Sequence, residues 1–97
     1  MDVQPPPIAA DLAAPVAAWI DWIRDERRLA ANTVEAYRHD LSGFLAFLAR
    51  HLGGPPDVAA LAGLAPADLR AWLAMRSARG YERTSNARAL ATVRGFF

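Results

Sequence analysis

The side chains best suited to acid–base chemistry are His39, Asp40 and His51. Imidazole and carboxylate groups can exchange a proton only within hydrogen-bond reach of each other. On one helix, His39 and His51 would lie about 18 Å apart at ~1.5 Å of rise per residue. We therefore expect no catalytic residue, two surface histidines, and at Asp40 a carboxylate that is solvated or lies on the N-terminal face. With no cysteine in the chain, the sequence also predicts no metal site and no cofactor, and no glycine-rich loop indicates a small-molecule ligand.

Anion binding is the chemistry that two other stretches indicate. Each looks like the start of a helix, with small hydroxyl or amide side chains followed by an arginine, and backbone N–H groups at such a start favour phosphate. Arginine also binds phosphate bidentately. The residues expected to contact duplex DNA are Asn32, Thr33, Arg38, Arg83, Thr84, Ser85, Arg88 and Arg94. Taken from the residues alone, a set of ordinary helix caps and solvated arginines explains the pattern equally well.

The charge distribution also indicates phosphate binding at the C-terminal end of the chain, although the net charge is only +1. The first 29 residues hold more acids than arginines, whereas residues 76–97 hold five arginines and one acid, Glu82. Every cationic side chain is arginine and none is lysine. A coding bias would produce the same arginine excess, so the asymmetry is only a weak indication of a phosphate-binding surface.

A long amphipathic helix over residues 32–52 is the element that must position these side chains. Its apolar residues recur at steps of three and four, which places them on one face: Val34, Tyr37, Leu41, Phe44, Leu45, Leu48 and Leu52. Asn32 is the expected N-cap, with Glu35 completing a capping box. Gly53-Gly54-Pro55-Pro56 ends the helix, because glycine takes the C-cap conformation and proline cannot continue it.

Three further helices are predicted around it. The first starts between Asp11 and Pro15 and buries Val16, Trp19, Ile20 and Ile23. After one or two turns within residues 57–64, another helix has Pro66 at its first position and Gly80 just past its end. The last has no well-defined start. Its expected core positions are Leu90, Val93 and Phe97.

Trp22 lies at the edge of the first helix's apolar face. A tryptophan there is most often partly buried core. The alternative is an exposed anchor for a protein partner, since aromatic residues are enriched at interfaces.

Residues 1–10, with their run of prolines, are expected to be a disordered lead-in, and residues 11–97 to form one all-α domain. No apolar run is long enough to span a membrane. The N-terminus lacks the features of a signal peptide, which indicates a cytoplasmic protein.

Three segments together resemble the N-terminal core-binding domain of tyrosine recombinases. They are L-A-A-N-T-V-E-A-Y-R-H-D-L-S-G-F-L-A-F-L at residues 29–48, A-D-L-R-A-W-L-A-M-R-S-A-R-G at residues 67–80 and S-N-A-R-A-L-A-T-V-R-G-F-F at residues 85–97. The last two look closest to the XerC branch of the Xer recombinases. The chain departs from the family at Tyr81-Glu82-Arg83, where a glycine-leucine-serine start is usual, and at Asn86, where an apolar residue is usual.

The resemblance implies a four-helix orthogonal SAM-like bundle that clamps one side of double-stranded DNA. The family's nucleophilic tyrosine lies in a separate C-terminal catalytic domain, so Tyr37 and Tyr81 are not expected to be nucleophiles, and this chain is expected to bind without cutting. Because the helical pattern runs on to Phe97, we expect a longer protein. As the resemblance implies, that protein would act with a XerD-like recombinase subunit to resolve chromosome dimers at cell division. Neighbouring subunits in the family touch partly through the first helix, where Trp22 lies.

Two alternatives to this interpretation stay open. One is the same module in a phage- or integron-type integrase. The other is an α-helical protein-interaction module of SAM type, with Trp22 and Trp19 as its contact residues.

Overall fold

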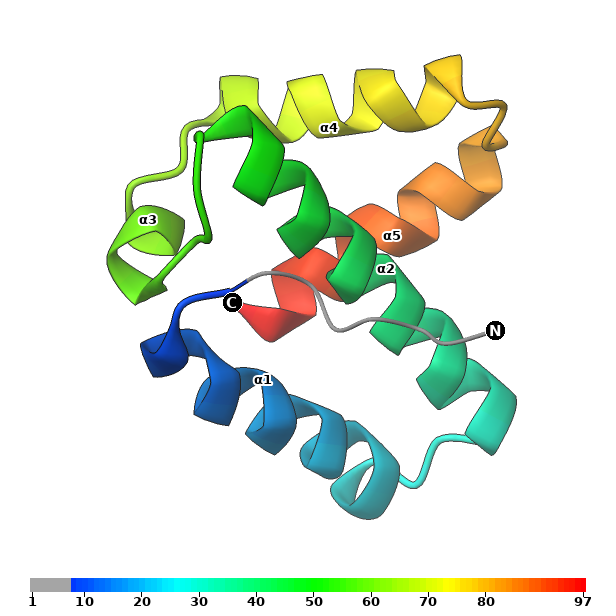
Figure 1. Ribbon diagram of the computed structural model, residues 1–97. Coiled ribbons are helices and arrows are strands. Elements are labelled where there is room, and N and C mark those ends of the chain that lie inside the picture. Colours follow the sequence, from blue (N-terminus) through cyan, green and yellow to red (C-terminus); the bar gives the residue numbers. More distant parts are fainter. Residues whose placement is uncertain (1–7) are drawn as a thin grey trace, which may run out of the picture.

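The computed structural model describes residues 8–97, and the expectation for residues 1–7 lies outside this range. The described chain forms five α-helices and one π-helical turn, with no strand in residues 8–97. The elements are α1 (Ala10–Asp21), η1 (Trp22–Glu26), α2 (Ala31–His51), α3 (Val58–Ala62), α4 (Pro66–Ala78) and α5 (Arg83–Phe96). Helices α2 and α5 cross at the centre, with α1 on one side and α4 on the other (Figure 1). The predicted all-α bundle is confirmed, and α3 is the short helical turn expected between the second and third long helices.

Helix α2 supplies most of the core, as its periodicity predicts. Val34, Leu41, Phe44, Leu45 and Leu48 are all buried. Trp72 of α4 closes over them, and its ring meets that of Phe44 edge to face at 4.8 Å. An edge-to-face pair of this kind stabilises the core beyond the area that it buries.

The predicted apolar face of α2 is wrong at its C-terminal end, where Leu52 is 45% exposed. The helix ends at His51, and Gly53 then adopts a left-handed φ of 82° that turns the chain away. Tyr37 is only half-buried. Phe47 is buried instead.

The start of α2 also differs from the prediction. Ala30 is its N-cap and no side chain caps it, so Asn32 lies within the first turn and the expected capping box is wrong. Glu35 pairs with Arg38 at 3.3 Å instead. The reason lies in the preceding turn, where η1 and the left-handed Arg28 (φ 51°) reverse the chain before Ala30.

Helix α4 begins and ends as predicted. Pro66 is its first residue. Asp68 accepts a hydrogen bond from the Ala65 N–H at 2.8 Å, which satisfies one donor at the helix start. Gly80 follows the end with a φ of 90°, a conformation that favours glycine.

Helix α5 begins at Arg83, with Glu82 as an N-cap that makes no side-chain bond. Its buried residues are Ala89, Thr92 and Val93, whereas Leu90 is half-buried. The predicted burial of Phe97 is wrong, since it is 61% exposed. Phe96 packs inward against Trp19 of α1, with ring centroids 5.8 Å apart.

Helix α1 begins at Ala10, earlier than predicted, and Pro15 lies inside it. Before it, the Ala9 N–H donates to the Pro56 carbonyl at 2.9 Å, and Ile8 packs against the core. Ile8 and Ala9 therefore contact the rest of the domain. No helix in residues 8–97 is long and apolar enough to cross a membrane.

Candidate nucleic-acid interface

The outward face of α5 combines positive charge with small side chains. The helix carries Arg83, Arg88 and Arg94 and no acidic residue. All three arginines are exposed, and so are Thr84, Ala87 and Ala91 between them. A smooth helix face flanked by arginines can approach a phosphate backbone closely, because no long acidic side chain opposes it.

The two helix starts predicted to bind phosphate lie on α2 and α5, and neither is capped by a side chain. Asn32 and Thr84 are exposed, whereas Thr33 and Ser85 are half-buried. None of the four serves as an N-cap, so the reading as ordinary caps is wrong. The uncapped N–H groups and the helix dipole leave each end suited to an anion.

Arg38 lies on the surface beside Glu35, with side chains 51% and 70% exposed. Exposed pairs of this kind contribute little free energy. A phosphate can therefore replace Glu35 as the partner of Arg38 at small cost.

Arg88 has a partner, Asp40, that its place in the sequence does not reveal. Its Nε and Nη2 atoms donate to the two carboxylate oxygens of Asp40, both at 2.9 Å. The Thr92 hydroxyl lies within donating distance of two acceptors, the Arg88 carbonyl at 2.9 Å and the Asp40 carboxylate at 3.2 Å. The hydrogen bond to Asp40 raises the pKa of Arg88.

Asp40 is fully buried, at 0% exposure, so its prediction as a solvated carboxylate is wrong. The spacing of Asp40 is a sequence feature that indicates this burial. Asp40 precedes the buried Phe44 by four residues, about one helical turn, so both lie on the same face of α2. A polar residue in register with an apolar face needs a buried partner.

A second cluster fastens α4 to α5. Arg76 is 3% exposed and its guanidinium lies between the rings of Trp72 and Tyr81, 5.5 and 4.0 Å from their centroids. Its Nε donates to Asn86 Oδ1 at 2.9 Å, and Asn86 Nδ2 donates to Ser77 at 3.1 Å. Asn86 thus holds the α4–α5 corner at a position where the recombinase pattern has an apolar residue.

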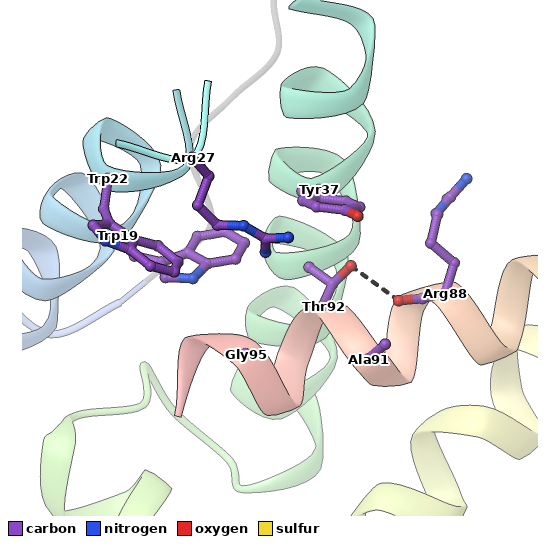
Figure 2. A pocket seen from close by; sticks show the side chains of 8 residues that line it. All are labelled: Trp19, Trp22, Arg27, Tyr37, Arg88, Ala91, Thr92 and Gly95. Atoms are coloured by element: carbon purple, nitrogen blue, oxygen red, sulfur yellow. Dashed lines mark hydrogen bonds between the residues drawn. The ribbon is translucent and has the colours of Figure 1, made fainter. Parts of the chain in front are cut away.

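A groove of about 300 Å³ lies between the α1–η1 end of the first helix on one side and α2 and α5 on the other. Trp19, Trp22 and Arg27 line one end, while Tyr37, Thr92 and Arg88 line the other (Figure 2). Trp22 is 46% exposed, with the guanidinium of Arg27 5.7 Å from its ring. The Trp22 ring is therefore partly accessible at the edge of this groove.

Residues 16–97 match the family described as phage integrase, N-terminal SAM-like domain. The chain belongs to this family. It is 51% identical over 88 residues to the tyrosine recombinase XerC of Methylobacterium nodulans, covering 91% of this chain and 27% of that protein. The XerC proteins of Rhodospirillum centenum and Brucella suis are 41% and 43% identical, over 90% and 91% of this chain and 26% and 28% of theirs. The chain thus spans about a quarter of the length of these relatives. No solved structure matches it significantly.

The two tyrosines and His51 of this integrase N-terminal domain are engaged in packing or pairing, whereas His39 is not. Tyr37 is half-buried and Tyr81 stacks on Arg76. His51 contacts Asp68 at 2.8 Å, while His39 is exposed. Within residues 8–97, no three His, Cys, Asp or Glu side chains gather where they could hold a metal ion.

Proposed function

We propose that this domain binds the backbone of duplex DNA, as the N-terminal module of a XerC-like site-specific tyrosine recombinase. Its contacts would be the outward face of α5 and the uncapped starts of α2 and α5. The family match and the relatives named XerC support the recombinase assignment. The residues proposed to contact DNA remain Asn32, Thr33, Arg38, Arg83, Thr84, Ser85, Arg88 and Arg94.

The face of α5 is the observation that carries this proposal. The major groove of B-form DNA admits one α-helix, and the small residues Thr84, Ala87 and Ala91 suit the centre of such a contact. Arginines at the flanks then reach phosphates on either side. Arg83 and Arg94 make no ion pair with an acid in residues 8–97, so their charge is available to a phosphate.

The activity of a longer protein is part of the same proposal. A separate catalytic domain would cut and rejoin the DNA, together with a XerD-like partner subunit, to resolve chromosome dimers in the cytoplasm. This domain would clamp the duplex without cutting it. The exposed Trp22 would contact a neighbouring recombinase subunit, since a half-exposed indole beside a groove is suited to a protein interface.

Fluorescence anisotropy with a labelled duplex of mixed sequence tests the DNA contacts. We expect weak, salt-dependent binding, with a dissociation constant of about 10⁻⁴–10⁻⁶ M. Arg38→Ala, Arg83→Ala and Arg94→Ala each remove one phosphate contact, so each lowers the slope of log affinity against log salt by about 0.9. Arg24→Ala is the matched control, because Arg24 is an exposed arginine that is already paired with Asp21 and Asp25. An unchanged slope in all three test variants rejects the proposal.

The groove favours protein binding as a second candidate function. In that case Trp22→Ala would abolish binding to a partner subunit, and duplex binding would be absent from the wild-type chain.

A further inference from the structure

The buried carboxylate of Asp40 is an expensive feature for so small a core. Removing a charge from water is strongly unfavourable, and well-packed apolar side chains often replace buried ion pairs without loss of stability. Asp40 is nevertheless fully buried and accepts hydrogen bonds from Arg88 Nε and Nη2, while the single hydroxyl hydrogen of Thr92 is shared between Asp40 and the Arg88 carbonyl. A need for stability alone does not account for an acid at this crossing of α2 and α5.

The consequence of the pair for Arg88 is a fixed guanidinium. A guanidinium has five N–H donors in a rigid planar fork. Asp40 takes the edge formed by Nε and Nη2, so the Nη1 edge points away from the carboxylate. The Arg88 side chain is still 42% exposed. Because the Arg88 side chain is already held in one conformation, it loses less conformational entropy when it binds a phosphate.

We propose that Asp40 is a positioning residue for DNA binding: it clamps Arg88 from inside the core and presents the free Nη1 edge to a backbone phosphate. This inference rests on the proposed function, and it adds a residue that cannot itself touch DNA.

The direction in which one substitution changes DNA affinity distinguishes a positioning role from a purely electrostatic one. Asp40→Asn removes a negative charge near the arginines, so attraction to phosphate alone predicts tighter binding. The amide keeps one acceptor oxygen but puts an NH2 donor in place of the other, so it breaks one of the two bonds that fix the Arg88 guanidinium. Positioning therefore predicts weaker binding despite the added positive charge, by about tenfold for the loss of one charge-assisted contact.

The experiment measures duplex affinity and its salt slope by anisotropy, with folding of each variant checked by circular dichroism. Asp40→Asn is compared with Glu35→Gln, a matched removal of one acid, which releases Arg38 on the surface and leaves binding equal or tighter. Asp40→Asn is expected to bind about tenfold more weakly, with a slope smaller by about 0.9. A folded Asp40→Asn variant that binds as tightly as the wild type overturns the inference.

Arg88→Lys provides a second measurement if Asp40→Asn does not fold. It leaves Asp40 a cationic partner, but an ammonium group has no rigid second edge to present. Its slope should fall by about 0.9 as well, and a wild-type slope in a folded Arg88→Lys protein overturns the inference. If the wild-type protein shows no salt-dependent binding to duplex DNA, the proposed function is refuted. If wild type binds and Arg83→Ala lowers the slope, but Asp40→Asn and Arg88→Lys do not, only the positioning role fails.

Discussion

The guanidinium of Arg76 lies 4.0 Å from the centroid of the Tyr81 ring, at the corner where α4 passes into α5. Arg76 is 3% exposed and forms no salt bridge within residues 8–97. Its charge is therefore stabilised by the faces of Tyr81 and Trp72 and by the Asn86 amide oxygen. Aromatic rings can do this because their faces carry partial negative charge.

Tyr81→Ala should expose this guanidinium and lower the free energy of unfolding by about 2 kcal/mol, the contribution of a desolvated cation–π contact. Tyr81→Phe keeps the ring face and should leave stability nearly unchanged. Urea denaturation followed by circular dichroism measures both variants. Equal stability of the alanine and phenylalanine variants would show that the ring does not stabilise Arg76.

Arg88→Ala should cost about 3 kcal/mol of folding free energy, because it leaves Asp40 buried without its cationic partner. This is the lower end of the usual range, since the loss of the half-exposed arginine also lets water approach the carboxylate. Arg94→Ala is the control: Arg94 is exposed on the same helix, and its removal should change stability by less than about 0.5 kcal/mol. Similar unfolding curves for the two variants would show that the Asp40–Arg88 pair does not stabilise the fold.

Asp68 should make the start of α4 sensitive to acid. The Ala65 N–H, and secondarily His51, lower the pKa of Asp68 in the folded protein below its ordinary value of 3.8. The folded state therefore holds this proton less tightly than the unfolded state. The stabilising contribution is present above the unfolded pKa and is lost as pH falls through the folded one.

The difference in melting temperature between the wild type and Asp68→Asn should accordingly shrink as the pH falls from about 5 toward about 2. His51→Gln should keep most of the wild-type pH dependence, because the backbone N–H is the larger cause of the lowered pKa. Parallel curves for wild type and Asp68→Asn at all pH values would refute the assignment.

The apolar face of α2 offers an internal comparison. Leu41 and Leu48 are 1% and 0% exposed, whereas Leu52 is 45% exposed. Leu41→Ala and Leu48→Ala should each lower the free energy of unfolding by about 2–5 kcal/mol. Leu52→Ala should stay within about 0.5 kcal/mol of the wild type. Chemical denaturation of all three variants checks the register, and a Leu52→Ala loss as large as that of Leu48→Ala would contradict it.

Those parts of the fold that depend on local chemistry were predictable from the sequence. Periodicity identified the α2 core, and the limits of α4 followed from Pro66 and Gly80, because backbone restrictions at these residues act without help from distant contacts. The register of α5 was not predictable in this way. Adjacent Phe96 and Phe97 suit the core equally well, and contact with Trp19 on α1 decides between them.

The candidate site was predictable only where it is exposed. The arginines of α5 stand out by composition, but the pairing of Asp40 with Arg88 joins residues 48 positions apart. The register of Asp40 with Phe44 places it toward the core, but its partner is identified only once the crossing of α2 and α5 is known. The burial of the charged end of Arg76 likewise depends on residues outside its own helix, because Tyr81 and Asn86 cover it.

The packing of α2 against α5 has a consequence for synthesis on the ribosome. Phe44, Leu45 and Leu48 are made early, but Ala89 and Val93, which share their core, are added near the end of this sequence. Until α5 emerges, the apolar face of α2 in the nascent chain stays exposed, and such a surface binds chaperones or promotes aggregation. Ribosome stalling within the α5 codons should therefore leave a protease-sensitive nascent chain, and release beyond Val93 should let it become resistant.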